Sequence, residues 1–188
     1  MKKFLLLSGA AMLFSANAQA MNHTNWSEIK PYIGAEYVYS KAKLGGSAGG
    51  MKDNFNSAKG DLGMELYHNM YAEFSYQQSW QVKNKYASPE GQSVKQRFAA
   101  YAMDLYGKFP IMCSNLGFLL TGGAAIYDVK QKNLPDDSFM RVGYRAGAGL
   151  QYDFNNHWSA RAIGRYSYVG AERLNNFKEV AVGMLYRF

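Results

Sequence analysis

The chain has 188 residues and a formal net charge of +7, and with 48% hydrophobic and only 19% charged residues its composition excludes an intrinsically disordered chain. A mean hydropathy of −0.33, with no apolar run of about 18 residues beyond the extreme N-terminus, excludes a bundle of membrane-spanning helices. The single cysteine, Cys113, excludes a disulfide framework and a cysteine-based zinc site.

Residues 1–20 have the order of a cleaved secretory signal peptide. Lys2 and Lys3 precede an apolar run, and Ala18-Gln19-Ala20 supplies the small residues of a cleavage site. The run is shorter than the roughly 20 residues that a spanning helix needs, which disfavours the alternative of a membrane anchor. We therefore expect export, with cleavage after Ala20 and a polar periplasmic lead at residues 21–29 before the main domain, 30–188.

Beyond residue 30 the sequence alternates between two faces with a period of two residues, which is typical of β-strands. The alternation predicts eight strands, over residues 31–40, 60–67, 70–80, 95–109, 116–128, 140–154, 158–168 and 179–188. It is clearest in the C-terminal half, where Val142 and Tyr144 share one face and Arg141 and Arg145 share the other. The fifth run, 116–128, is apolar and glycine-rich on both faces, so the sequence does not assign its facing.

The connections between these strands are alternately short and long. The short ones are residues 68–69, 110–115 and 155–156, and the long ones are 41–56, 83–94, 130–138 and 170–176. Strict alternation puts every short turn at one end, together with both termini. That is the layout of an outer-membrane barrel with up-and-down topology.

The strands of a soluble sandwich or a lipocalin-like barrel would also alternate between an apolar and a polar face. The composition of the two faces therefore has to distinguish these folds from a membrane barrel. The charged face carries glycines, which suit the narrow interior that eight strands enclose. They are Gly34, Gly63, Gly143, Gly147, Gly149 and Gly183. The apolar face, with Val180, Val182 and Met184 in the last strand, carries aromatic residues near the strand ends, as expected at a membrane boundary. The predicted fold is all-β, an eight-stranded antiparallel transmembrane β-barrel.

Several segments carry a family resemblance. They are residues 31–37 (PYIGAEY), 147–152 (GAGLQY), 155–161 (NNHWSAR) and the C-terminal Tyr186-Arg187-Phe188. With the signal peptide, they resemble the small eight-stranded outer-membrane β-barrels typified by the membrane domain of outer-membrane protein A, outer-membrane protein X and the opacity-type proteins. The resemblance covers residues 30–188. It implies location in the cell outer membrane and makes Tyr186 and Phe188 a signal to the outer-membrane assembly machinery.

Charges on the inward face are distributed unevenly around the predicted barrel. The acidic members are Glu36, Asp61, Glu65, Glu73 and Asp104, and the basic members are Arg141, Arg145, Arg161 and Arg165, with Arg187 beside them and Lys108, Asp153 and Glu179 as minority members. Since isolated buried charges are costly and paired ones can coexist, we predict a lumen plugged by ion pairs. Counting from the turns puts Arg161 level with four of the acids, Glu36, Asp61, Glu73 and Asp104, and puts Arg145 and Arg165 about one layer above. The alternative is charges solvated in small water pockets.

An enzymatic site is disfavoured by position. His157-Trp158-Ser159 is similar to the His and Ser of outer-membrane lipid A deacylases, with Glu172 as a conceivable third member. His157 follows a short turn, however, and Glu172 lies one strand away, on the order of 30 Å. No cluster of residues has the spacing of metal ligands and no phosphate loop occurs, so we expect no cofactor, no metal and no enzyme.

The predicted function is a structural and surface-interaction role, with adhesion as one form of it. Basic residues such as Lys41, Lys52 and Lys85 in the long loops could contact lipopolysaccharide phosphates or an acidic host ligand. The alternative is that they are solvated residues that keep the rim of the barrel soluble. The expected partners are outer-membrane lipid, lipopolysaccharide and the assembly machinery, with no nucleic acid, and the barrel is expected to be a monomer. A narrow porin-like channel is the alternative, and a lipid-modifying enzyme is a weaker one.

Overall fold

A computed structural model of the chain describes residues 30–43, 54–67, 69–84, 94–111, 114–132, 138–171 and 174–188. The predicted signal peptide and the lead, residues 1–29, lie outside these ranges. Across the ranges that are described, no helix is long and apolar enough to cross a membrane.

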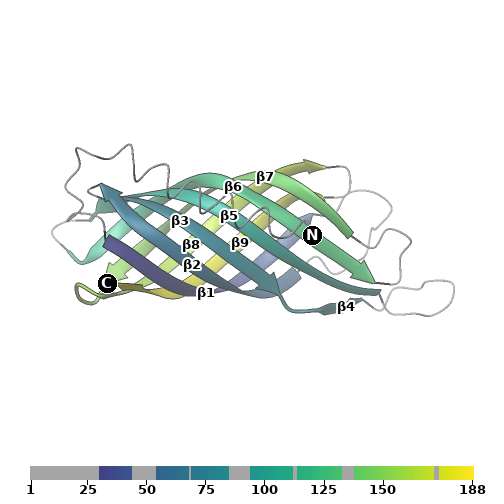
Figure 1. The fold of residues 1–188 in the computed structure, drawn as a ribbon, viewed down its shortest axis with the longest axis horizontal. Helices are drawn as coiled ribbons and strands as arrows, with labels where there is room; N and C mark the ends of the chain where they lie inside the picture. Colours follow the sequence, from purple (N-terminus) through teal and green to yellow (C-terminus); the bar gives the residue numbers. More distant parts are fainter. Residues whose placement is uncertain are drawn as a thin grey trace.

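The described residues form one antiparallel sheet that closes on itself (Figure 1). Its strands are β1 (Lys30–Lys43), β2 (Asn54–Tyr67), β3 (Met70–Ser79), β4 (Val82–Asn84), β5 (Val94–Pro110), β6 (Leu116–Lys132), β7 (Ser138–Asp153), β8 (Trp158–Ala171) and β9 (Leu174–Arg187). β3 and β4 both pair with β5 and make one continuous wall element. Pairing of β1 with β9 closes the barrel, which confirms the predicted eight-stranded up-and-down fold.

The three short turns and the C-terminus lie together at what we call the turn end; the opposite end is the loop end. Backbone hydrogen bonds join the turn-end segments: Lys108 N donates to Asn69 O at 2.7 Å, and Phe188 N donates to Pro31 O at 3.1 Å. Asn69 has a φ of 65°, a left-handed conformation that asparagine tolerates in a tight turn. The predicted clustering of the short turns is confirmed.

Strands extend further toward the loop end than the sequence predicts. β2 begins at Asn54 instead of residue 60, and β8 and β9 stay paired up to Ala171 and Leu174, so the predicted long connection over 170–176 is wrong. Cross-strand hydrogen bonds satisfy the backbone even where the side chains are polar. A hydrophobic pattern does not detect such extensions.

The two faces are arranged as predicted. Val180, Val182 and Met184 are 48–59% exposed on the outer wall, whereas Glu36 and Arg161 are 4% exposed in the lumen. The structure shows which residues of β6 face the lumen, which the sequence left open. Phe118 and Leu120 point outward, and alternate residues from Leu119 to Val129 line the lumen. The members of that series are Leu119, Thr121, Ala125, Tyr127 and Val129.

Glycine on the inner face makes room for large lumen residues. A Cβ placed on Gly63 would lie 2.2 Å from Cζ of Tyr32, and one on Gly183 would lie 2.7 Å from Cα of Glu36. Both separations are far inside van der Waals contact, so the residues opposite these glycines occupy the space that a side chain would need.

Aromatic rings form a belt at each end of the outer wall. At the turn end, Tyr186 packs against Trp158 and Phe188 with ring centroids 5.0 and 5.2 Å apart. At the loop end, the Tyr37–Trp80 and Tyr76–Tyr101 centroid distances are 5.8 and 5.0 Å. Two such belts flanking an apolar band are typical of a membrane-spanning barrel.

Candidate functional site

The middle of the lumen is filled by charged side chains that we call the ionic layer. Its members are three acids, Glu36, Asp61 and Glu73, and three bases, Lys59, Arg161 and Arg165, each at most 4% exposed. The formal charges of the six groups therefore cancel. They project from β1, β2, β3 and β8, so the contacts between them cross the barrel interior.

Arg161 is the centre of the ionic layer. Its Nε donates to Glu36 Oε1 at 2.7 Å, and its Nη1 donates to Glu73 Oε2 at 2.8 Å. Its Nη2 lies 3.4 Å from Asp61 Oδ2, and its Cζ lies 4.9 Å from the centroid of the Tyr106 ring. One guanidinium thus contacts all three acids and stacks on an aromatic face, a geometry that its planar set of donors permits.

Lys59 makes a second set of contacts to the same acids. Its Nζ lies 2.8 Å from Glu36 Oε2, 2.7 Å from Asp61 Oδ1 and 3.2 Å from Glu73 Oε1. Lys59 is absent from the predicted lumen residues because the predicted strand starts at residue 60. Extending the same alternation back from Asp61 would have placed Lys59 on the inner face.

Two tyrosines complete the hydrogen bonding of the layer. Tyr32 Oη donates to Glu73 Oε2 at 3.0 Å, and Tyr106 Oη donates to Glu73 Oε1 at 2.9 Å. Arg165 Nη2 donates to Tyr106 Oη at 2.9 Å, and its Nη1 to Glu36 Oε2 at 3.3 Å. Hydrogen bonds of this kind compensate the desolvation of charges in a low-dielectric interior.

Asp104 lies directly opposite Glu73, as its predicted level implies, but it pairs with Arg145 and not with Arg161. Arg145 Nε donates to Asp104 Oδ1 at 2.6 Å, and Nη2 of the same guanidinium donates to Ser75 Oγ at 3.3 Å. Gly123 lies opposite Asp104 on one side and opposite Arg145 on the other. Because Gly123 has no side chain, the arginine can reach across it. Counting from turns does not reveal this row, because it depends on the stagger between strands.

Two of the residues predicted for this network lie outside it. Glu65 is partly buried toward the turn end and makes no ion pair with any described residue. Arg141 is exposed near the loop end, where its Nη1 donates to the carbonyl of Met140 at 3.1 Å. Both occupy inward positions of their strands, but they lie too far along them to reach the ionic layer.

A second, smaller group of charges lies at the turn end of the lumen. Asp153 accepts from Lys108 Nζ and from Arg187 Nη2, and it also accepts from Ser159 Oγ at 2.7 Å and Gln151 Nε2 at 3.0 Å. We call this group the turn-end cluster. Its Lys108 and Asp153 side chains are 12% and 20% exposed, so they remain in contact with water.

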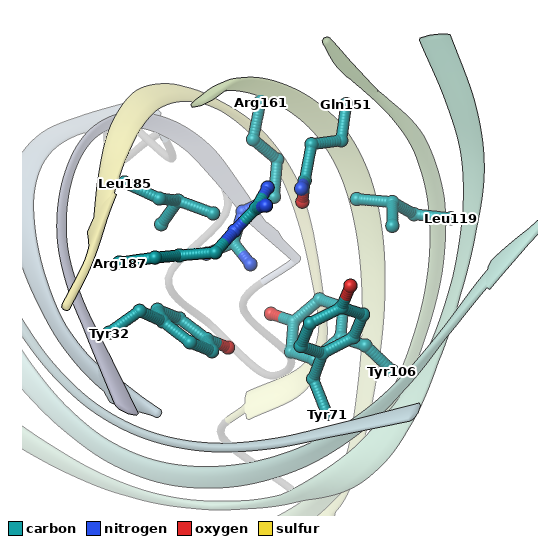
Figure 2. A pocket seen from close by; sticks show the side chains of 8 residues that line it. All are labelled: Tyr32, Tyr71, Tyr106, Leu119, Gln151, Arg161, Leu185 and Arg187. Carbon is teal, nitrogen blue, oxygen red and sulfur yellow. The ribbon is translucent and has the colours of Figure 1, made fainter. Parts of the chain in front are cut away.

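Between the turn-end cluster and the ionic layer lies a cavity of about 10 Å³ (Figure 2). Arg161 and Arg187 reach into it from one side, and the rings of Tyr71 and Tyr106 face it from the other. A cavity of that size holds about one water molecule.

The lumen toward the loop end is filled by aromatic rings, which we call the aromatic layer. Its rings belong to Phe55, Phe98, Tyr127 and Phe177. The centroid of Phe98 lies 5.4 Å from that of Phe55 and 5.2 Å from that of Phe177, and Tyr127 stacks on Phe177 at 4.8 Å. All four are at most 5% exposed. This layer was not predicted from the sequence.

The histidine and serine considered as catalytic do not act on each other. Nδ1 of His157 lies 3.0 Å from the carbonyl oxygen of Arg187, and its ring stacks on Tyr186. The hydroxyl of Ser159 donates to Asp153. Glu172 lies outside the described residues. Within the described ranges, no three metal-binding side chains come together.

Comparison with known proteins identifies the class of barrel. The sequence model of the outer membrane protein beta-barrel domain matches residues 6–188. Neisserial surface protein A is similar over 84% of this chain and 97% of its own, with a TM-score of 0.66 and 17% identity. The N-terminal β-barrel domain of OprF from Pseudomonas aeruginosa covers 84% of this chain and 97% of its own, with a TM-score of 0.60 and 16% identity.

A third similar structure contains a bound molecule. Ail, the attachment invasion locus protein of Yersinia pestis, was crystallised in complex with the heparin analogue sucrose octasulfate. It covers 86% of this chain and 99% of its own, with a TM-score of 0.60 and 19% identity. No curated protein matches the sequence. At these identities the similarity to the solved structures establishes the fold alone.

Proposed function

The chain belongs to the outer membrane protein beta-barrel domain family and is located in the bacterial outer membrane, and on this premise we propose that it is a closed barrel with a structural and surface-interaction role. The observation that carries the proposal is the filled lumen. Side chains of the aromatic layer, the ionic layer and the turn-end cluster follow one another along the axis, and the cavity between the last two has room for about one water molecule.

A conducting pore would need a continuous column of water through these layers. The ionic layer would have to open against compensated charge pairs, which is costly because each separated group would lose its partners in a low-dielectric interior. The polar group among the four rings of the aromatic layer is the Tyr127 hydroxyl, which already donates to Ser167 Oγ at 2.7 Å, so these rings do not form a row of groups that could coordinate a passing ion. A sealed barrel fits this lumen better than the narrow porin-like channel.

Single-channel recording tests the seal. The mature barrel, refolded and inserted into planar bilayers, should show no stable open level above the bilayer background. Folding is verified beforehand by the altered electrophoretic mobility of the unheated sample. A reproducible open level of one defined size in correctly folded protein would contradict the sealed lumen and support a channel.

The surface role is supported by the layout of the barrel. Outer-membrane barrels have short periplasmic turns and longer extracellular loops, so we assign the turn end to the periplasm and the loop end to the cell exterior. Loops held on a rigid scaffold are common binding surfaces. Among the similar structures, Neisserial surface protein A is named as a surface protein, and Ail was seen with a sulfated ligand.

Cell binding by loop-deleted barrels tests this role. Bacteria displaying the intact barrel should bind host cells more strongly than bacteria displaying a barrel shortened within residues 44–53 or 85–93. Shortening the 154–157 turn, at the opposite end, serves as the control, with surface abundance matched. Equal binding by all of these strains would contradict a host-ligand role.

A further inference from the structure

The buried charges of the lumen do not cancel once Asp104, Arg145 and Glu179 are counted together with the ionic layer. Among the described residues, nine charged side chains are at most 4% exposed. The five acids are Glu36, Asp61, Glu73, Asp104 and Glu179, and the four bases are Lys59, Arg145, Arg161 and Arg165. An ion in a low-dielectric interior is costly unless it is paired, and a buried acid in excess is commonly neutralised by a proton. One negative charge is left over here, and a bound proton would neutralise it.

Two of the five acids lie apart from the others. Asp104 accepts from Nε of Arg145 at 2.6 Å. Glu179 accepts from Ser40 Oγ at 3.2 Å and lies directly opposite Arg165 in the β8–β9 pair. Opposite charges at facing positions of two strands attract each other. Both acids therefore have a facing base, which leaves the surplus negative charge to the three acids of the ionic layer.

These three acids crowd around one cation. Nζ of Lys59 lies 2.8 Å from Glu36 Oε2, 2.7 Å from Asp61 Oδ1 and 3.2 Å from Glu73 Oε1. Because each oxygen lies within 3.2 Å of the same nitrogen, no two of them are more than about 6 Å apart. Like charges at that separation repel strongly where water does not screen them, and carboxylates that share a site often retain one proton.

Asp61 is the least well bonded of the three acids. Glu73 accepts hydrogen bonds from four described side chains, those of Tyr32, Lys59, Tyr106 and Arg161. Glu36 accepts from three, those of Lys59, Arg161 and Arg165. Asp61 accepts from one described side chain, Nη2 of Arg161 at 3.4 Å, and its Oδ1 touches Lys59 without the alignment of a hydrogen bond. Hydrogen bonds of this kind stabilise the ionised form of an acid, so ionisation of Asp61 is the least favoured.

Charged groups face Asp61 from four strands. They are Glu36 of β1, Lys59 of β2, Glu73 of β3 and Arg161 of β8. The residues directly opposite Asp61 on its two neighbouring strands are Gly34 and Ser75, which carry no charge. Two acids and two bases therefore surround it, and neither base is left over to pair with a third carboxylate.

We propose that Asp61 binds a proton in the folded barrel and is present there as a neutral carboxylic acid. Four acids and four bases then remain among the nine buried groups, and their formal charges cancel. The proton also makes Asp61 a hydrogen-bond donor, and the oxygens of Glu36 and Glu73 around Lys59 can accept from it. In the unfolded chain this aspartate is ionised at neutral pH, so folding of the barrel takes up the proton.

Infrared spectroscopy of the refolded barrel, in a detergent without carbonyl groups, tests the proposal. A protonated carboxyl has a C=O stretching band above the frequencies of the amide bands, whereas an ionised carboxylate has none there. Folded wild type at neutral pH should show this band, and Asp61→Asn should lose it. Glu179→Gln removes the other buried acid that has an oxygen without a described hydrogen-bond partner, and it should keep the band.

Urea unfolding at neutral pH provides a second readout with a matched variant. Asp61→Asn replaces a neutral acid by a neutral side chain of similar shape, so it should change the equilibrium constant for unfolding by less than about tenfold. Glu73→Gln removes a paired buried charge from the same layer and should raise that constant by at least about a hundredfold. Altered electrophoretic mobility of unheated samples verifies that both variants fold.

The pH dependence of unfolding supplies a third readout. The folded barrel binds one more proton than the unfolded chain, so its stability should fall as the pH is raised above neutral. Asp61→Asn has no proton to release at this position. The wild-type barrel should therefore lose stability relative to Asp61→Asn as the pH rises.

A band that is absent from folded wild type, or that persists in folded Asp61→Asn, would overturn the proposal. Equal destabilisation by Asp61→Asn and Glu73→Gln would also overturn it, because Asp61 would then be ionised like its neighbour. The spectrum of wild type decides whether any buried carboxyl is protonated even if a variant fails to fold. Conductance recordings address the sealed lumen separately, since a closed barrel can contain either form of Asp61.

Discussion

The ionic layer and the aromatic layer both exclude water from the lumen, but they do so by different physical means. In the aromatic layer, stabilisation comes from the burial of apolar rings, and burial does not require one particular partner for each ring. The rings are those of Phe55, Phe98, Tyr127 and Phe177. In the ionic layer, the charge of each member is paired with opposite charges of other members. Apolar packing is lost in proportion to the atoms removed, whereas removal of one charge leaves its partners buried and uncompensated.

The difference also affects which strand pairings are tolerated. Arg161 on β8 bonds to Glu36 on β1 and Glu73 on β3, across the lumen. A slipped register would move these groups to different heights or turn them outward, and the charges would lose their partners. Phenylalanines displaced by one row could still find apolar neighbours. We infer that the ionic layer specifies the register of the barrel and the aromatic layer contributes mainly burial.

Removing the central base should have the largest effect. Arg161→Ala leaves Glu36, Asp61 and Glu73 with too little positive charge, and it should lower the free energy of unfolding by about 3–5 kcal/mol. Urea unfolding in phospholipid vesicles measures it. The control is Arg141→Ala, an exposed arginine that makes no cross-barrel hydrogen bond or ion pair with a described residue. If Arg161→Ala unfolds at the same urea concentration as wild type, the ionic layer does not stabilise the barrel.

Truncating a ring of the aromatic layer should have a smaller but substantial effect. Phe98 is 1% exposed and touches two other rings, so Phe98→Ala should cost about 3 kcal/mol through lost burial and a residual cavity. Met103→Ala, a 54% exposed position on the outer wall of the same strand, is the control. The measurement is again the free energy of unfolding in vesicles.

Double variants then test whether the two layers are independent. Phe98→Ala and Phe177→Ala should couple by about 0.5–1.5 kcal/mol, because their rings are in contact. Phe98→Ala and Arg161→Ala share no partner and should add within about 0.5 kcal/mol. Strong coupling in the second pair would mean that the layers act as one unit, contrary to the comparison above.

The sequence was sufficient for the topology and for the facing of most strands, because each strand must alternate between lipid and lumen. It was insufficient for side-chain contacts that depend on the stagger between neighbouring strands. Asp104 meets Arg145 because Gly123 lies in the same row, and no count along a single strand reveals that row. The alternation also has little contrast near the loop end, where Phe55 and Phe177 fell within or beside predicted loops and Lys59 was left out of its strand.

The turn-end cluster offers the smallest expected effect and the sharpest test of why burial matters. Lys108 and Asp153 form an ion pair like those of the ionic layer, but their side chains are 12% and 20% exposed. Water compensates a charge that loses its partner there, so Lys108→Ala should cost about 1 kcal/mol or less. Raising the salt concentration should shrink that cost further, since ions screen exposed pairs, while the cost of Arg161→Ala should hardly change.

Unfolding curves for both variants at low and high salt measure the two responses. A cost of Lys108→Ala that equals that of Arg161→Ala and resists salt would show that exposure does not distinguish the two groups. The expected result instead ties the strength of the ionic layer to the absence of water around it. The aromatic layer on one side and the tyrosines facing the small cavity on the other would then stabilise the charges indirectly, by keeping water out.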